Sequence, residues 1–212
     1  LGDVYKRQLL GQIKPGMQEK ELAALLEYEM AKRGSERPSF DTILISGAKT
    51  SMPHGMPDTK PVAAGEFILV DFGAVVNGYH SDMTRTFALG SATERMRTVY
   101  STVLAAQETG IRMLRAGVSC DQPHLAAHQV IRDAGFGDCF GHALGHCVGL
   151  EIHESPALSP RAKQHLEPGM VITVEPGIYL PGEFGVRIED LLLIQPDGAE
   201  DLTHTPKKLL IL

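Results

Sequence analysis

The stretch EFILVDFGAVVNGYHSDMTRTFAL, residues 66–89, predicts an antiparallel hairpin, because two apolar segments flank the dipeptide Asn77-Gly78. Asn-Gly in this context is a strong signal for a two-residue hairpin turn. If the turn holds, Asp71 faces Thr84, and Asp82 lies diagonal to Asp71 on the same face. Diagonal neighbours of this kind are roughly 7 Å apart at Cβ. Both carboxylates are therefore expected to converge on one pair of metal ions.

The second half of the chain repeats the first at an offset of about a hundred residues, which indicates an internal repeat. KELAALLEYEMAKRG (20–34) parallels PHLAAHQVIRDAGFG (123–137), with a shared Leu-Ala-Ala at 22–24 and 125–127. Both segments have the spacing of apolar residues that is typical of helices.

The strands repeat in the same order. AAGEFILVD (63–71) parallels EPGMVITVE (167–175), so each stretch ends in an acid, and Asp82 and Glu189 each return on the following strand. Two helix-plus-hairpin halves predict one α+β domain with pseudo-twofold symmetry. The acidic residues are expected where the halves meet.

Helices are expected over three segments. Residues 14–34 read as a turn followed by a helix that ends at Gly34, with one apolar face made of Leu22, Leu25, Leu26 and Met30. Residues 91–117 begin with an expected capping box of Ser91 and Glu94. A third helix follows Asp121 and runs towards Gly135.

The composition is that of an ordinary globular protein, with 212 residues, 43% of them hydrophobic and 22% charged. A net charge of -6 without Lys/Arg runs argues against nucleic acid and anionic membranes as partners. Three cysteines without a CxxC pair favour a reduced, cytoplasmic setting. Residues 1–10, which start LGDVYKRQ, are expected to be a non-native or unstructured leader before a single domain at 11–212.

Five residues have the chemistry to hold two divalent cations. Each one taken alone has an ordinary interpretation, since Asp82 could cap a turn and Glu189 could pair with Arg187 on a strand. Four carboxylates buried without a cation would destabilise any fold, whereas a dinuclear metal turns them into ligands. Carboxylates with one imidazole suit manganese, cobalt or iron, and zinc less decisively. The candidates are Asp71, Asp82, His146, Glu175 and Glu189.

The histidines divide into two groups. His146 and His153 are seven apart in GHALGHCVGLEIHE, too glycine-rich for a helix, and would not share a strand face, so one can bind metal while the other faces a substrate. His54 stands in a Pro/Gly-rich loop, and His142 is as readily structural as functional. The remaining histidines are expected on the surface or on helix faces: His80, His124, His128, His165 and His204.

The motifs PHG, VDFGA, SDMTRT, GHALGHCVGLEIHE, VEPGIY and VRIED follow one another in this order. With them the chain, from about residue 11 to its end, resembles the pita-bread metallopeptidases, which include methionine aminopeptidase, Xaa-Pro aminopeptidase and prolidase. The resemblance implies a pita-bread fold with the metal site between its two halves. It also implies hydrolysis of the N-terminal peptide bond of a peptide substrate.

The resemblance further implies how the metal ligands are shared. Asp71 would chelate the first metal, His146 and Glu175 the second, and Asp82 and Glu189 would bridge both. A hydroxide held between the metals would attack the scissile carbonyl while Glu175 moves the proton to the leaving nitrogen.

The same resemblance assigns the residues that face the substrate. His54 and His153 would hydrogen-bond the substrate carbonyl and the intermediate. His142, Tyr179 and Arg187 would bind the substrate or shape its pocket.

Several members of this class fit the residues. Pro53 stands where methionine aminopeptidases commonly have Cys, and GLEIHE and GVRIED resemble the proline-specific branch, so an Xaa-Pro enzyme using manganese is expected. A methionine aminopeptidase is the alternative, followed by a metal-free peptide-binding relative and a creatinase-like hydrolase. The resemblance implies that the N-terminal domain of Xaa-Pro enzymes, which contributes to oligomerisation, is missing from this stretch of sequence, and a homodimer is expected for a full-length protein.

Overall fold

The computed structural model describes residues 10–212 and confirms the hairpin that the Asn-Gly signal predicts. β3 (Phe67–Phe72) pairs antiparallel with β6 (Met83–Ala88), and Asp71 faces Thr84. The hairpin continues as β4 (Ala74–Val76) paired with β5 (Tyr79–His80). Asn77 and Gly78 have φ values of 52° and 78°, and positive φ at both turn residues is what a type I′ turn requires.

A second long hairpin forms in the other half of the chain. β9 (Val171–Val174) pairs with β12 (Asp190–Gln195), with Val174 facing Asp190. Further along, β10 (Gly177–Leu180) pairs with β11 (Phe184–Arg187), with Gly177 facing Arg187. The same register runs through both ladders, and Glu175 and Glu189 fall in the break between them. A break in the ladder frees these residues from strict strand geometry.

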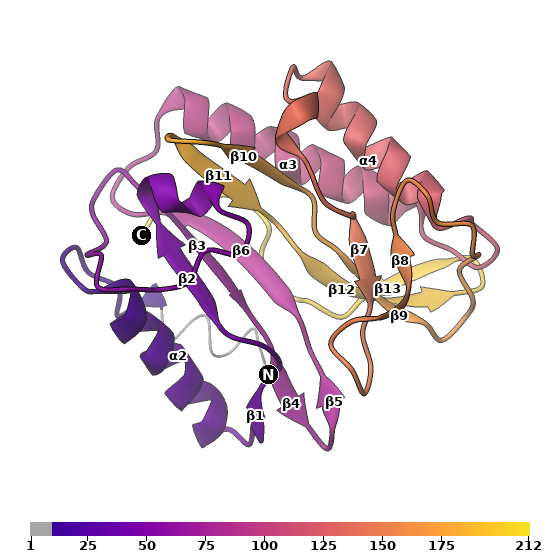
Figure 1. Cartoon of the computed structure of the whole chain (residues 1–212), viewed down its shortest axis with the longest axis horizontal. Helices are drawn as coiled ribbons and strands as arrows, with labels where there is room; N and C mark the ends of the chain where they lie inside the picture. Colours follow the sequence, from indigo (N-terminus) through magenta and orange to yellow (C-terminus); the bar gives the residue numbers. More distant parts are fainter. Residues whose placement is uncertain (1–9) are drawn as a thin grey trace.

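The described strands form four sheets, and the two that carry β3-β6 and β9-β12 meet in the middle of the molecule (Figure 1). The first has the order β2-β3-β6, with β2 at Ile43–Ser46, and the second the order β13-β12-β9-β7-β8. Within the second sheet, β7 is Gly145–Cys147, β8 is Glu154–Leu158 and β13 is Gly198–Asp201. The two smaller sheets have the orders β1-β4-β5, with β1 at Arg37–Pro38, and β10-β11. The backbone N–H of Glu189 donates to the Thr84 carbonyl at 3.1 Å, which joins the two halves directly.

Three of the helices in the described part of the chain cover the outer faces of the sheets (Figure 1). α2 (Glu19–Lys32) packs against the first sheet, and α3 (Glu94–Met113) and α4 (Asp121–Asp133) pack on each other beside the second. Each half has a hydrophobic core of its own between helix and sheet. The short 3-10 helices are η1 (Gly47–Ser51) and η2 (Gly137–Cys139).

The repeat is present in the architecture, but the residue match proposed for its helices is wrong. α2 buries Leu22, whereas Leu125 of α4 is 51% exposed. The two helices bury equivalent faces when Leu22 is matched with Pro123 instead, two residues earlier than the shared Leu-Ala-Ala suggests. Packing against the sheet determines which face of each helix is buried, and the shared Leu-Ala-Ala sequence does not. The matched buried positions are Leu22, Ala23, Leu26 and Met30 in α2, and Pro123, His124, Ala127 and Ile131 in α4.

The start of α3 also differs from the prediction. Thr93 is the N-cap, and its hydroxyl accepts a hydrogen bond from the Met96 N–H at 3.2 Å. The expected capping box of Ser91 and Glu94 is therefore wrong, because Glu94 is already the first helical residue. A threonine directly before the helix can reach the free N–H groups of its first turn.

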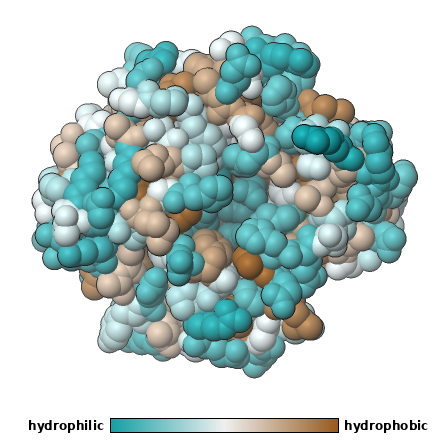
Figure 2. All heavy atoms as spheres, viewed as in Figure 1, coloured by the Kyte–Doolittle hydropathy of each residue, from teal (hydrophilic) through white to brown (hydrophobic). Residues whose placement is uncertain are grey.

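The described helices include none long and apolar enough to cross a bilayer. Hydrophilic side chains dominate the face shown in Figure 2, and hydrophobic ones stand in small separate patches. The expected leader at residues 1–10 lies, apart from Leu10, outside the described residues and stays a prediction.

Candidate metal centre

The structure brings all five candidate ligands to one cavity of about 400 Å³. They come from both hairpins and from β7, so segments more than a hundred residues apart contribute to one site. Asp71 lies in β3, Asp82 directly before β6, His146 in β7, Glu175 directly after β9 and Glu189 directly before β12.

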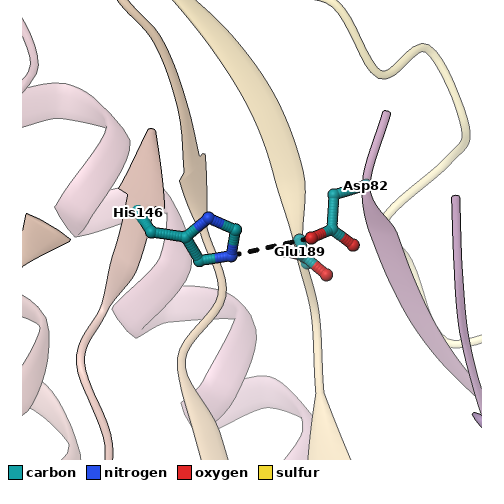
Figure 3. Close-up of side chains that lie close together, drawn as sticks. All are labelled: Asp82, His146 and Glu189. Carbon is teal, nitrogen blue, oxygen red and sulfur yellow. Dashed lines mark ion pairs between the residues drawn. The ribbon is translucent and has the colours of Figure 1, made fainter. Parts of the chain in front are cut away.

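Three of the five come close enough to share one ion. One potential ligand atom each from Asp82, His146 and Glu189 lies within 4.8 Å of the others (Figure 3). His146 Nε2 is 3.6 Å from Asp82 Oδ2 and 3.4 Å from Glu175 Oε1. The imidazole therefore points into a group of acids instead of towards solvent.

Two glycines allow the strands beside these ligands to approach closely. A Cβ at Gly73 would lie 1.8 Å from the Ser81 carbonyl oxygen, next to Asp82. A Cβ at Gly145, the residue before His146, would lie 1.9 Å from the Thr173 carbonyl oxygen. Any side chain at either position would force the backbones apart and move the neighbouring ligand.

Backbone and threonine groups hold the ligands in place. His146 Nδ1 is 3.1 Å from the Cys147 carbonyl oxygen, which leaves Nε2 as the nitrogen that faces the cavity. Thr84 donates to Glu189 Oε2 at 2.7 Å, and Thr173 donates to Glu175 Oε1 at 3.2 Å. Sequence reasoning missed both threonines. Each is two residues from a predicted acid on a strand, and this alternation was the available signal.

Arg187 is the buried cation of the site. Its Nη2 donates to Asp71 Oδ2 at 2.5 Å, and its Nη1 donates to the Tyr179 hydroxyl at 2.9 Å and the Pro53 carbonyl at 3.2 Å. The guanidinium thus ties the loop that follows η1 to both hairpins. The second carboxylate oxygen of Asp71, Oδ1, is buried without a hydrogen-bond partner.

The cavity carries more negative charge than Arg187 can balance. Burial raises the pKa of Glu175 to about 7, with Arg187 opposing the shift and the Asp71 carboxylate adding to it. Burial also raises the pKa values of Asp82 and Glu189 well above their usual range, and the neighbouring carboxylates raise them further. Burial lowers the pKa of His146, so its imidazole is neutral and available as a ligand. An oxygen-rich set with one neutral imidazole fits a divalent metal.

His54 and His153 both line the cavity and are exposed. His146 and His153 do not lie on one strand, because the chain turns between them, and the separate roles expected for them stay a prediction. His146 lies in β7 and His153 directly before the neighbouring strand β8, and their rings meet edge to face with centroids 4.4 Å apart. Both imidazoles therefore face the same cavity from adjacent segments.

His142 lines the cavity, and its Nε2 is 3.0 Å from the Tyr179 hydroxyl. Burial lowers the pKa of His142 to about 4, so it is neutral at physiological pH. Tyr179 itself is not among the lining residues, since its ring is buried behind His142 and Arg187. Its substrate contact stays a prediction, and the structure places it as a support for its two neighbours.

Part of the cavity wall carried no signal in the sequence. Phe40, Asp41, Ile43 and Met56 line it from the segment before and at the start of β2 and from the loop after η1. Among the other histidines, His124 is a buried helix-face residue, at 6% exposure, whereas His165 and His204 are exposed.

Residues 2–196 match the profile of Metallopeptidase family M24. The Xaa-Pro dipeptidase of Pyrococcus furiosus is 45% identical over 199 residues, which are 94% of this chain and 57% of that protein.

Solved structures give the same result. The Xaa-Pro dipeptidase from Bacillus anthracis superposes with a TM-score of 0.98 at 43% identity, over all of this chain and 59% of that one. The X-Pro aminopeptidase from Thermotoga maritima has a TM-score of 0.97 at 43% identity, over all of this chain and 60% of that one. The pita-bread expectation is thereby confirmed. The chain spans about 60% of the length of these relatives.

Proposed function

The chain belongs to metallopeptidase family M24, and we propose that its acidic cavity binds two divalent metal ions and hydrolyses the N-terminal peptide bond of Xaa-Pro peptides. The observation that carries the proposal is the convergence of four carboxylates and one imidazole in a cavity also lined by His54 and His153. No arrangement of structural ion pairs explains so many acids around a single buried arginine.

The five converging side chains would hold the metal ions. Asp71 fits as a ligand because its Oδ1 is buried and has no hydrogen-bond partner. Asp82 and Glu189 fit as ligands because burial, and after it the neighbouring carboxylates, raise their pKa values, and bound cations would offset both effects. When bound, such ions polarise the scissile carbonyl and lower the pKa of a water molecule. Manganese is the metal that we propose, with cobalt, iron and zinc as the alternatives.

Glu175 is proposed to move the proton. Its carboxylate lines the cavity beside the other four candidate ligands, so it lies within reach of a water molecule held there. It would take a proton from the attacking water and deliver it to the leaving nitrogen of the scissile bond. The Thr173 hydroxyl holds Oε1, which restrains the carboxylate for this transfer.

His54 and His153 are proposed to bind the substrate carbonyl. Both imidazoles are exposed at the cavity and can donate a hydrogen bond to an oxygen that gains negative charge. Arg187 keeps Asp71 oriented, and the neutral His142 is proposed to contact the substrate on the opposite side.

An Xaa-Pro bond offers no N–H group, so recognition depends on shape and on carbonyl contacts. The cavity provides an apolar wall that suits a pyrrolidine ring, made of Phe40, Ile43, Pro53 and Met56. Relatives named Xaa-Pro dipeptidase and X-Pro aminopeptidase support this substrate class over Met-initiated peptides.

Metal binding is expected to stabilise the chain. It should also make the free energy of unfolding rise with pH instead of falling, because the metal binds the ionised carboxylates. The raised carboxylate pKa values mean that the metal-free chain is most stable with the acids protonated, so its free energy of unfolding should fall between about pH 6.5 and about pH 8. His146 is neutral in both folded and unfolded states over most of this range. Manganese at a thousandfold excess over Kd should add about 4 kcal/mol. Urea unfolding at both pH values, with and without manganese, measures the change, and magnesium serves as the control ion.

The function is tested by assaying manganese-loaded protein on Xaa-Pro, Xaa-Ala and Met-Ala peptides, together with metal analysis of the same sample. We expect cleavage of Xaa-Pro peptides that stops when the metal is chelated and resumes when it is restored. Preferential cleavage of Met-Ala would instead make the chain a methionine aminopeptidase. Peptide binding without metal or cleavage would identify a pseudoenzyme.

A further inference from the structure

A second cavity of about 390 Å³ adjoins the acidic one and is not used by the proposed chemistry. The two cavities share His142 and Ala143 as a common wall. The second cavity lies between α4 and the segments 140–143 and 159–161. We call it the His-Arg cavity, and its lining residues include His124, His128, Phe140, Ser159 and Arg161.

Polar groups of the His-Arg cavity lack partners. His124 is 6% exposed, and its Nδ1 is buried without a hydrogen bond. Within residues 10–212, Arg161 makes no hydrogen bond and no ion pair. A buried polar group without a partner costs free energy, and native structures rarely leave one without a reason. This cost applies to the His124 nitrogen, whereas Arg161 is exposed, so its guanidinium is solvated in the free chain and is open to a ligand.

The walls of this cavity are held in place by ring contacts. The rings of His124 and His128 stack with centroids 5.9 Å apart, and both lie against Phe140, at 5.5 and 6.0 Å. Phe140 in turn meets the His142 ring edge to face at 5.0 Å. One continuous aromatic group therefore connects the second cavity to the shared wall. A preformed wall of this kind reduces the cost of ordering side chains when a ligand binds.

The two cavities differ in charge. The acidic cavity attracts cations, whereas the His-Arg cavity offers a guanidinium, imidazole nitrogens and the Ser159 hydroxyl, which suit a carboxylate. A peptide has this polarity, with an ammonium group at one end and a carboxylate at the other. Each residue after the scissile bond extends the chain by about 3.3–3.6 Å, so residues beyond proline would pass the shared wall.

Resting on the proposed function, we propose that the His-Arg cavity binds the C-terminal carboxylate of Xaa-Pro peptides longer than a dipeptide, with Arg161 as its main contact. The chain then acts on tripeptides and longer peptides in preference to Xaa-Pro dipeptides. In a dipeptide the C-terminal carboxylate is that of proline itself, and it stays in the acidic cavity on the other side of His142 from Arg161.

The test compares an Xaa-Pro dipeptide, an Xaa-Pro-Gly tripeptide and the same tripeptide with a C-terminal amide. Arg161→Ala is expected to lower kcat/KM for the tripeptide acid about tenfold, the effect of losing one charge-assisted hydrogen bond. The dipeptide and the tripeptide amide should be unaffected, and Arg161→Lys should restore part of the loss. Lys163→Ala is the matched control, because it removes the same charge from a side chain that is 84% exposed and outside the cavity.

Equal losses for all three peptides, or no loss for the tripeptide acid, would overturn the proposal. Calorimetric binding of the same peptides to the metal-free chain repeats the comparison without turnover. If no peptide is cleaved but the acid still binds more tightly than the amide and depends on Arg161, the proposed function fails and the carboxylate site stands. If inorganic phosphate binds through Arg161 while acid and amide bind alike, the cavity is a free-anion site and the proposal is wrong.

Discussion

Replacing Glu175 with alanine is expected to abolish peptide hydrolysis while the chain remains folded. The side chain lies in the cavity among the groups proposed to hold the metals, and proton transfer by a positioned group typically contributes about 10²- to 10⁴-fold to a rate. Its loss should not destabilise the metal-free chain near pH 8, because a buried carboxylate with a raised pKa opposes folding once it is ionised. Single-turnover hydrolysis of an Xaa-Pro peptide measures the effect.

Glu175 is also a proposed metal ligand, so the assay needs a measurement of bound metal on the same sample. Glu175→Gln keeps the size of the side chain and retains an oxygen for the metal, and it should be as inactive as Glu175→Ala. Glu151→Ala is the matched control, since it removes an exposed carboxylate that does not line the cavity. A Glu175 variant that cleaves peptides at the parent rate would show that this carboxylate moves no proton.

Replacing Arg85 with methionine is expected to cost about 3–5 kcal/mol of unfolding free energy, the range for breaking a buried ion pair from one side. Arg85 is 1% exposed, and its Nη2 donates to Asp190 Oδ1 at 2.6 Å and to the Thr205 carbonyl at 2.9 Å. Its Nη1 donates to the carbonyls of Thr84 and Glu189, which border the two halves of the site. The substitution would remove a buried cation from Asp190, which keeps Lys207 and Gln107 as side-chain partners, and would remove a donor from the three carbonyls.

Arg95→Met provides the matched control for this measurement. Arg95 also binds a carboxylate through two nitrogens, at 2.6 and 2.8 Å from Glu183, but its side chain is 53% exposed. Exposed pairs of this kind contribute about 0–1 kcal/mol. Urea unfolding of both variants without metal measures the unfolding free energy that each one loses. The difference between the two losses reports the effect of burial, since each arginine is paired with a carboxylate. Equal losses for the two arginines would contradict the role assigned to the buried network.

Local sequence determined the first hairpin and the faces of its acids. Asn77-Gly78 has the backbone freedom that a tight turn needs, so the register from Asp71 to Thr84 followed from the turn alone. Alternation along each strand then placed Asp71 and Asp82 together. These features depend on residues a few positions apart, which is why the amino-acid sequence was sufficient for them.

Other features depended on packing between distant segments. Arg187 reaches the carbonyl of Pro53, 134 positions away in the chain, and His146 meets Asp82 only because two separate hairpins pack together. The buried face of α4, the support of His142 by Tyr179 and the His-Arg cavity depend on the same packing. Contacts between segments this far apart leave no periodic pattern in the sequence. The sequence by itself therefore determined which residues could bind metal and on which strand faces they lie. Only the tertiary structure decided which side chains meet, because that depends on how the two halves bury their apolar surfaces against each other.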